Sequence, residues 1–290
     1  MSIFVDKNTK VLVQGITGTQ ASFHIKRSLS NGTNIVAGVT PNKGGTVHLG
    51  VPVFDRVSEA VAATGANASV MFVPARQVVS AVIEGVEAGL DLMVCIADNV
   101  PVKDMMEVKA ILKGTKTKLI GPNTPGIITP EAANLGVFPE NIHHPGRVGV
   151  VSRSSSLTYE AVLETTRAHA GQSTVIGLGD DMIIGMDFVD VLRAFHEDDA
   201  TDVIVMLGQM GGTFEEQGAA FYQSLKRKKP VIGFVAGNTV PAGHKMGYAG
   251  DLITNGNITV QDKINAMRQA GMIMVDNIND IRDELAKLLA

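Results

Sequence analysis

The stretch of residues 10–26, KVLVQGITGTQASFHIK, joins an apolar run to a helical pattern through two glycines. Residues 10–13 form a short apolar β run, Gly15 and Gly18 interrupt it, and helical spacing resumes from Thr19. A strand, a glycine turn and a helix N-terminus make a seat for an anion. The first N–H groups of a helix have no partner inside it, and the helix dipole is positive at that end. Phosphate is the expected ligand.

The glycine spacing differs from the dinucleotide fingerprint G-x-G-x-x-G, which needs a glycine where this chain has Thr17. For this stretch alone, an ordinary tight turn in a parallel sheet stays open. An NAD site also expects an acidic residue after the next strand. Here residues 34–39 lead instead into TPNKGG, which contains Lys43. A lysine at that place favours a phosphorylated ribose, as in NADP or coenzyme A, over a free diol.

Composition narrows the class of protein. The chain has 290 residues, enough for two domains, and its net charge of −4 gives no electrostatic footprint for nucleic acid. No apolar run approaches the roughly 18 residues that span a bilayer, and the start lacks a signal-peptide pattern, so we expect a cytoplasmic protein with no membrane partner. The single cysteine, Cys95, ends an apolar run and is expected to be a buried thiol in a reducing compartment.

Short apolar runs alternate with helical stretches in the first part of the chain. Strands are expected at residues 11–13, 34–39, 68–73, 92–96 and 118–120, and helices near residues 21–30, 57–64, 77–88 and 102–112. This alternation predicts βαβ units with right-handed crossovers, and hence an α/β fold with one parallel, doubly wound, Rossmann-like sheet.

Breaker residues in the middle of the chain predict a linker over residues 123–146, between domains of residues 1–122 and 147–290. Strands are then expected at residues 147–152, 173–177, 203–207, 230–236 and 272–275, and helices near 157–169, 188–197, 213–227, 260–270 and 278–289. This pattern predicts a second parallel sheet of flavodoxin-like type. His143 and His144 in the linker have no Cys, Asp or Glu at ligand spacing, so no metal site is predicted.

Loops rich in glycine or serine follow three strands of the second domain, at residues 152–158, 208–213 and 236–250. Because the carboxyl ends of parallel strands share one edge of a sheet, we expect these loops to form one site. Three hydroxyls at a helix start fit simple N-caps or, with free N–H groups, a second phosphate seat: Ser154, Ser155 and Ser156. The backbone around Gly211 and Gly212 would complete that seat.

Longer stretches of the chain carry a family resemblance. They are VDKNTKVLVQGITGTQ, GVTPNKGGTVHLGVPVFD, GPNTPGIITP, HPGRVGVVSRSSSLTYEAV and GQSTVIGLG. With them the sequence resembles the α subunits of succinyl-CoA synthetase from end to end. The resemblance implies an N-terminal coenzyme A-binding domain and a C-terminal ligase domain. It also implies a separate ATP-grasp β-type subunit that holds ATP or GTP with Mg²⁺ and much of the site for a small carboxylic acid.

The resemblance also implies which residues form the sites. The family's contacts to coenzyme A fall on Thr17, Gly18, Thr19, Gln20, Lys43, Ile96, Ala97 and Asp98. Its substrate-site tyrosine falls on Tyr159. The position of Lys43 agrees with the independent argument from the phosphorylated ribose.

The chain departs from its family at the phosphate relay. The family carries phosphate on a histidine in a G-H-A-G motif, where this chain has Tyr248. The family's orienting glutamate falls on Gln209. Because a carboxylate orients an imidazole better than an amide does, the two changes match chemically. Asp180 and Asp181 stand where the family usually has Gly-Gly-Asp, which adds one negative charge near the expected phosphate path.

The leading function implied by the resemblance is the α-type subunit of an acid–CoA ligase that forms acyl-CoA with cleavage of a nucleoside triphosphate. The missing histidine leaves a second function open, a paralogue that cannot be phosphorylated and that holds coenzyme A or an acyl-CoA to regulate or scaffold its partner. An NAD oxidoreductase is disfavoured by the missing acid after the second strand. His244, four positions before Tyr248, is expected to be a surface histidine and not a relay.

Overall fold

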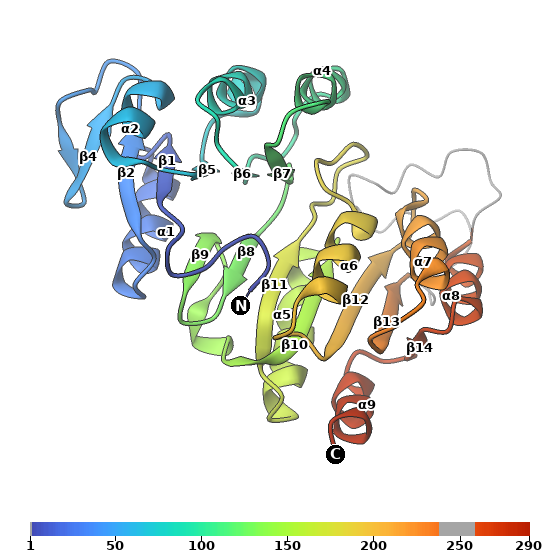
Figure 1. The fold of residues 1–290 in the computed structure, drawn as a ribbon. Helices are drawn as coiled ribbons and strands as arrows, with labels where there is room; N and C mark the ends of the chain where they lie inside the picture. The colour runs from blue at the N-terminus through green and yellow to red at the C-terminus, as the bar shows by residue number, and fades with distance from the viewer. Residues whose placement is uncertain (1, 238–258) are drawn as a thin grey trace. The chain divides into compact units, whose positions relative to one another are not determined.

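A computed structural model describes residues 2–237 and 259–290 of the chain. It divides the chain into two compact units. The N-terminal unit comprises residues 4–140 with residues 183–185, and the C-terminal unit comprises residues 1–3, 141–182 and 186–290. Figure 1 labels most of their helices and strands. Tyr248 and His244 lie outside the described residues.

The N-terminal unit is built on a sheet in the strand order β3-β4-β2-β1-β5-β6-β7. Its strands are β1 (Val11–Gln14), β2 (Ile35–Val39), β3 (Val47–His48), β4 (Val51–Phe54), β5 (Ala68–Met71), β6 (Leu92–Cys95) and β7 (Lys118–Ile120). Neighbours are parallel except β3 and β4, which form an antiparallel edge hairpin. Counted along the chain without β3, the order is 3-2-1-4-5-6, which confirms the predicted Rossmann-like sheet.

The helices of this unit are α1 (Thr19–Ser30), α2 (Val57–Thr64), α3 (Val78–Glu87) and α4 (Val102–Leu112), with the short 3₁₀ helix η1 (Ala75–Gln77). Right-handed crossovers place α1 on one face of the sheet and the other three on the opposite face, because the chain moves outward from β1 in one direction and later returns in the other. The contacts of α2 with α3 and of α3 with α4 agree with this arrangement (Figure 1).

The hairpin of β8 (Gly126–Thr129) and β9 (Ala133–Gly136) belongs to the N-terminal unit. It contacts α1, β5 and β6, so it covers the part of the sheet that the crossover rule leaves without a helix on the α1 face. Ile127 and Leu135 are fully buried there. The segment 123–146, predicted as a linker, therefore holds this hairpin, η2 (Glu140–Ile142) and the start of the next strand, and the chain passes between the units at residues 140 and 141.

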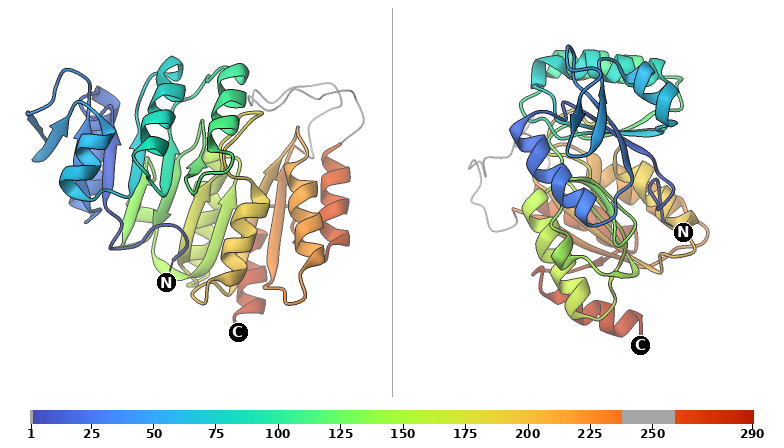
Figure 2. Two further views of the ribbon diagram at one scale, coloured as in Figure 1. Left: turned by 45° about the horizontal axis from the view of Figure 1, so that its top comes forward. Right: turned by 90° about the vertical axis from the view of Figure 1, so that its left-hand side faces the viewer.

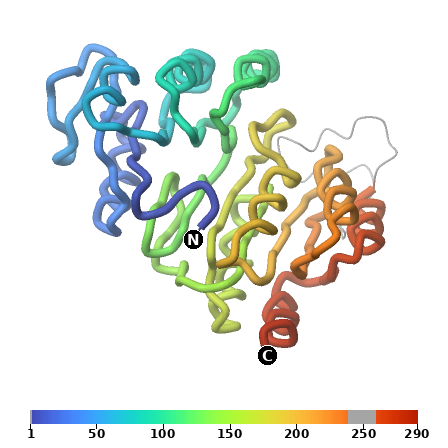
Figure 3. The backbone as a smooth tube through the Cα atoms, viewed as in Figure 1, coloured from blue at the N-terminus to red at the C-terminus, as the bar shows by residue number. Residues whose placement is uncertain are grey.

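The C-terminal unit has parallel strands in the order β14-β13-β12-β10-β11. They are β10 (Pro145–Ser152), β11 (Gln172–Gly177), β12 (Val203–Gln209), β13 (Val231–Ala236) and β14 (Ile273–Met274). Counted along the chain the order is 2-1-3-4-5, the flavodoxin-like order that the sequence predicts. Figure 3 follows the backbone through this alternation of strands and helices.

The helices of the C-terminal unit are α5 (Ser155–Arg167), α6 (Phe188–Glu197), α7 (Phe214–Ser224), α8 (Val260–Gln269) and α9 (Asp280–Leu288). Helix α5 packs with α9, whereas α6 packs with α7 and α7 with α8, so the two sets cover opposite faces of the sheet (Figure 2). Within residues 2–237 and 259–290, each helix is too short or too polar to cross a bilayer.

Each sheet has a switch point, which is the place where consecutive connections leave in opposite directions. In the N-terminal unit this point lies between β1 and β5, and in the C-terminal unit it lies between β10 and β12. The loops that follow two such neighbouring strands lead to opposite faces of the sheet and leave a crevice between them. Open α/β sheets bind their ligands in this crevice. The fold therefore offers one candidate site in each unit.

Gly149, in the centre of β10, tests the packing of the C-terminal unit. A Cβ atom at this position would lie 2.6 Å from Cε1 of the Phe195 ring, which is fully buried on α6. We expect Gly149→Ala to lower the free energy of unfolding by about 1–3 kcal/mol, the usual cost of overpacking, and we expect this cost to shrink in a Phe195→Leu background. Urea denaturation of the four chains measures both effects. Equal costs in the two backgrounds would contradict the contact.

Candidate functional site

The turn between β1 and α1 brings the backbone close to both neighbouring strands. Gly15 has a φ of 80°, and its N–H donates to the carbonyl oxygen of Val39 at 2.8 Å. A Cβ atom on Gly15 would lie 2.4 Å from the carbonyl oxygen of Phe72, just beyond β5. Both the left-handed φ and this close approach require glycine. The turn is therefore shaped by the strands at the switch point.

Helix α1 begins at this turn. Gly18 is its N-cap and offers no side chain to the first N–H groups of the helix. Its own N–H donates to the carbonyl oxygen of Gly15 at 3.0 Å, which closes the turn. Thr19 and Gln20 follow in the first helical turn and are exposed. N–H groups without an intrahelical partner, at the positive end of the helix dipole, face a ligand of negative charge favourably.

The loop after β2 carries Lys43 and is fixed by a carboxylate. The N–H groups of Lys43 and Gly44 both donate to Oδ1 of Asp55, at 3.0 and 2.9 Å. The hydroxyl of Thr17 donates to that of Thr40 at 3.4 Å, which joins this loop to the β1–α1 turn. The sequence did not single out Asp55, because nothing in its local pattern reveals that its partner lies twelve residues earlier. The Lys43 side chain itself is exposed.

The loop after β6 contains the remaining predicted contacts of this unit. Ile96 and Ala97 are half-buried and Asp98 is exposed. The N–H of Ile96 donates to the carbonyl oxygen of Met71 at 3.2 Å, and Ala97 accepts a hydrogen bond of 2.8 Å from the N–H of Asn123. Since β1, β2 and β6 are parallel, the structure brings all eight predicted coenzyme A contacts to the carboxyl edge of one sheet.

In the C-terminal unit, Ser154 acts as an ordinary N-cap of α5. Its Oγ accepts a hydrogen bond of 3.4 Å from the N–H of Leu157, and the residue is buried. Its own N–H donates to Oγ of Ser152 at 3.0 Å. The N–H groups of Ser155 and Ser156 stand in the first turn, where a helix provides no internal partner. The simple capping role thus applies to Ser154, while the next two residues keep the geometry of an anion seat.

Tyr159 lies on α5, one turn after these serines, and is half-buried. Burial raises the pKa of the Tyr159 phenol above its usual value, because the charged form loses hydration. The hydroxyl therefore stays protonated at neutral pH and is able to donate a hydrogen bond. This is the form that a carboxylate substrate would need from a tyrosine.

The loop of residues 208–213, here called the glycine loop, begins with the last two residues of β12 and meets the start of α5. Gly211 and Gly212 have φ angles of 83° and 62°, in the left-handed region that favours glycine. The Nη1 atom of Arg153, which precedes Ser154, donates to the carbonyl oxygen of Gly211 at 3.3 Å. The structure thereby brings together the two loops that the sequence assigned to one phosphate seat.

Gln209, at the end of β12, contacts the loop after β11. Its Nε2 donates to Oδ1 of Asp180, and its backbone N–H donates to Oε1 of Glu215 at 3.1 Å. Because an ionised carboxylate only accepts, the amide nitrogen must face Asp180, and the other end of the amide is turned away. Oε1 of Gln209 is buried and has no hydrogen-bond partner among the described residues. The amide at position 209 is thus committed to Asp180.

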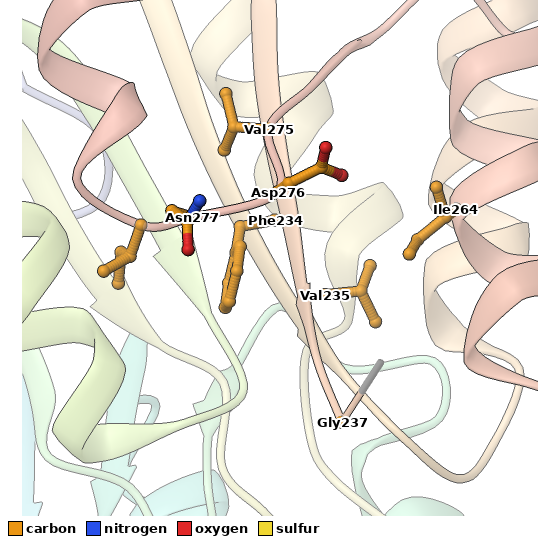
Figure 4. Close-up of a pocket in the computed structure, with 8 residues that line it drawn as sticks. Phe234, Val235, Gly237, Ile264, Val275, Asp276 and Asn277 are labelled. Atoms are coloured by element: carbon orange, nitrogen blue, oxygen red, sulfur yellow. The ribbon is translucent and has the colours of Figure 1, made fainter. Parts of the chain in front are cut away.

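A cavity of about 300 Å³ lies at the carboxyl ends of β13 and β14 (Figure 4). Most of the residues that line it are apolar, and Asp276 and Asn277 add polar groups. The lining residues are Phe234, Val235, Gly237, Ile264, Val275, Asp276, Asn277 and Ile278. A Cβ atom on Gly237 would lie 3.4 Å from Cβ of Met210, so this cavity borders the glycine loop.

Comparisons with known proteins agree with the order of the two units. A model of the CoA binding domain matches residues 6–99, and a model of the CoA-ligase domain matches residues 151–273. Together with the two sheets and their carboxyl-edge loops, these matches define a class of protein in which a coenzyme A-binding domain precedes a CoA-ligase domain.

Relatives identify the family within that class. The ADP-forming succinate–CoA ligase subunit alpha of Staphylococcus epidermidis is 50% identical over 281 residues, which cover 97% of this chain and 93% of that protein. The corresponding subunit of Staphylococcus aureus is 50% identical over 94% of this chain and 90% of that protein. This chain therefore belongs to the family of succinate–CoA ligase alpha subunits, as the resemblance implied.

A solved structure supports the fold over the whole chain. The ATP citrate lyase of Methanothrix soehngenii, in complex with citrate and coenzyme A, matches with a TM-score of 0.89 and 25% identity. The match covers 99% of this chain and 50% of that chain, so this chain spans half the length of that enzyme.

The contact between Gln209 and Asp180 predicts a strongly pH-dependent variant. In Gln209→Glu, two carboxylates face each other, and we expect a loss of about 1–3 kcal/mol in the free energy of unfolding at pH 8. One carboxyl then binds a proton more tightly when folded than when unfolded, so the loss should shrink as the pH falls towards 5. Asp180→Asn in the same chain should restore stability at pH 8. Urea denaturation at both pH values measures this, and a Gln209→Glu chain as stable as the unmodified one at pH 8 would contradict the contact.

Proposed function

We propose that this chain is the α-type subunit of an acid–CoA ligase. It binds coenzyme A in its N-terminal unit and, with an ATP-grasp β-type subunit, forms an acyl-CoA from a small carboxylic acid. The partner holds ATP or GTP with Mg²⁺, and nucleotide cleavage drives the reaction through an acyl phosphate. The observation that carries the proposal is 50% identity to succinate–CoA ligase alpha subunits over 97% of the chain.

The residues at the carboxyl edge of the N-terminal sheet fit coenzyme A. Gly18 begins α1 without a side chain over the first N–H groups of the helix, so a pyrophosphate is able to approach them. Asp55 holds the loop of Lys43 by two N–H groups, which presents an exposed ammonium for the ribose phosphate. Coenzyme A supplies the thiol that accepts the acyl group, while these residues bind and orient its phosphates.

The C-terminal unit supplies the second anion seat of the proposal. The first turn of α5, with Ser155 and Ser156, and the backbone of Gly211 and Gly212 receive the phosphoryl group, and Tyr159 donates to the carboxylic acid. Support comes from the hydrogen bond between Arg153 and Gly211, which joins the two loops. We place the ligase in the cytoplasm, where a reducing environment keeps the buried Cys95 a thiol.

One observation favours a second candidate function. The Nε2 of Gln209 donates to Asp180, and the acceptor left at position 209 is a neutral amide oxygen, which orients an imidazole and raises its basicity far less well than a carboxylate does. With Tyr248 at the family's phosphohistidine position, this supports a chain that binds coenzyme A or an acyl-CoA without carrying phosphate. Such a chain would regulate or scaffold its partner.

Lys43 and Asp55 give a direct test of the coenzyme A site. We expect Lys43→Ala to weaken coenzyme A binding by roughly 1–3 kcal/mol, the range for one lost charge-assisted hydrogen bond. Asp55→Ala should weaken coenzyme A binding as well, because the loop loses both hydrogen bonds that its N–H groups donate to the Asp55 carboxylate. Titration calorimetry measures both, with Lys109→Ala, an exposed lysine bound to the carbonyl oxygen of Gly185, as the control. Tight binding of NAD with no binding of coenzyme A would refute the assignment.

Labelled nucleotide separates the two candidate functions. With its partner and labelled ATP or GTP, we expect the unmodified chain to form no acid-labile phosphohistidine. Tyr248→His with Gln209→Glu should recover little label, because the new glutamate faces Asp180 and is repelled by it. Adding Asp180→Gly should recover clearly more, since only then does the carboxylate at 209 stand free to orient the imidazole. Robust acyl-CoA synthesis with label on a histidine of the unmodified chain would overturn this expectation.

A further inference from the structure

A buried group of ions lies behind the glycine loop, and neither anion seat uses it directly. The side chains of Arg153, Glu215 and Lys263 are 1%, 0% and 1% exposed. Arg153 directly precedes the N-cap of α5, whereas Glu215 and Lys263 lie in the first turns of α7 and α8. We call these three residues and the partly exposed Glu216 the ion cluster.

Lys263 uses all three of its ammonium protons within the ion cluster and the glycine loop. It donates to Oε2 of Glu215 at 2.6 Å and to Oε2 of Glu216 at 3.0 Å. Its third hydrogen bond, of 2.8 Å, reaches the carbonyl oxygen of Gly212. A lysine from α8 therefore fixes a peptide group of a loop that lies about fifty residues earlier in the chain.

Glu215 and Arg153 hold the rest of the same loop. Oε1 of Glu215 accepts the N–H of Gln209 at 3.1 Å, and Nη1 of Arg153 donates to the carbonyl oxygen of Gly211 at 3.3 Å. The Arg153 guanidinium also lies 4.9 Å above the ring of Phe214. Its Nε has no hydrogen-bond partner among the described residues. Peptide groups at three positions of the glycine loop are thus held by buried charges.

Stability alone does not account for such a group. The ion cluster contains two cations and two carboxylates and is neutral as a whole, so it adds no net attraction for an anion. Taking ions out of water costs several kcal/mol per ion, and a packed apolar set of similar volume is often as stable or more so. What the cluster does provide is a fixed direction for each peptide group that it binds.

That direction follows from the planarity of the peptide bond. In a trans peptide the C=O and the next N–H point in opposite directions. Because the carbonyl oxygens of Gly211 and Gly212 are drawn to the buried cations, the N–H groups of Gly212 and Thr213 point away from them. Gly212 and Thr213 are both exposed. Successive N–H groups held outward in this way form a concave seat for an anion.

We propose that Lys263, with Glu215 and Arg153, is a positioning residue that aims the N–H groups of Gly212 and Thr213 at the transferred phosphoryl group. This inference rests on the proposed function, which puts a phosphate at the glycine loop. Lys263 itself touches no ligand. It acts through the carbonyl oxygen of Gly212 and through Glu215.

The test separates positioning from stability with two variants of the full chain. Lys263→Met removes the closer of the two cations beside buried Glu215 and leaves only the Arg153 guanidinium, 3.7 Å from Oε1, so both the melting temperature and the affinity for inorganic phosphate should fall. Lys263→Met with Glu215→Gln removes that poorly compensated charge and keeps an acceptor for the N–H of Gln209. We expect the melting temperature to recover in the double variant, while phosphate affinity stays roughly fivefold to thirtyfold below that of the unmodified chain.

Backbone NMR supplies a second readout on the same variants. Order parameters of the Gly212 and Thr213 amides should fall from about 0.85 to below about 0.6 in both, because the carbonyl oxygen of Gly212 is no longer held. Lys263→Arg should restore most of the order and the affinity. Lys229→Met is the matched control, since Lys229 donates to the carbonyl oxygens of Phe195 and Asp198 and not to the glycine loop. It should lower the melting temperature only.

The outcomes distinguish this inference from the proposed function. If phosphate affinity and loop order recover together with the melting temperature in the double variant, the ion cluster is purely structural and the inference is wrong. If the unmodified chain binds coenzyme A but no inorganic phosphate, the phosphate seat fails, and the order parameters still decide whether Lys263 fixes the loop. If the unmodified chain does not bind coenzyme A, the proposed function is wrong, independently of the result for Lys263.

Discussion

The structure depends on what happens to backbone N–H groups where parallel strands part. At each switch point one strand feeds a helix on one face and its neighbour feeds the opposite face, so helix N-termini and loop N–H groups meet without partners inside the fold. In the N-terminal unit the approach of Gly15 to Phe72 sets this geometry. In the C-terminal unit the bond from Arg153 to Gly211 does so. The two predicted anion seats thus follow first from topology, and side chains such as Arg153 then fix the loops around them.

The strands and helices of both sheets could be predicted from sequence because their patterns are local. All four residues of β1, β5 and β6 are buried, and such apolar runs stand out against the helical periodicity between them. The hairpins β3–β4 and β8–β9 did not stand out, since strands of two to four residues beside glycine and proline look like loops. These hairpins are stabilised by tertiary contacts that a local pattern does not show. The contacts of β8 with β6 and of β9 with β5 are an example.

The candidate site divides along the same line. Glycines in the left-handed conformation and serines at a helix start can be recognised in the sequence, because tight turns and helix caps favour those residue types. Asp55, Glu215 and Lys263 were not found, since each acts on a peptide group between 6 and 51 residues away and has no neighbouring pattern to mark it. In the sequence, Lys263 resembles the other polar residues of α8, which suggests an exposed side chain, whereas in the structure its side chain is 1% exposed. Tyr248 lies outside the described residues, so its role stays a prediction.

The pair of Gln209 and Asp180 decides which chemical group is compatible with the site. With Nε2 given to Asp180, the only group that Gln209 has left is Oε1, which is a pure acceptor and is buried without a partner among the described residues. An unpaired buried acceptor is costly, so it favours a neighbour that donates, such as a phenol or a protonated imidazole. A phosphoryl group offers acceptors and negative charge, and Asp180 adds a further negative charge beside it. The same two residues therefore favour a donor next to Oε1 of Gln209 and disfavour a phosphate in direct contact with that oxygen, which leaves the outward N–H groups of Gly212 and Thr213 as the phosphate seat of the proposal.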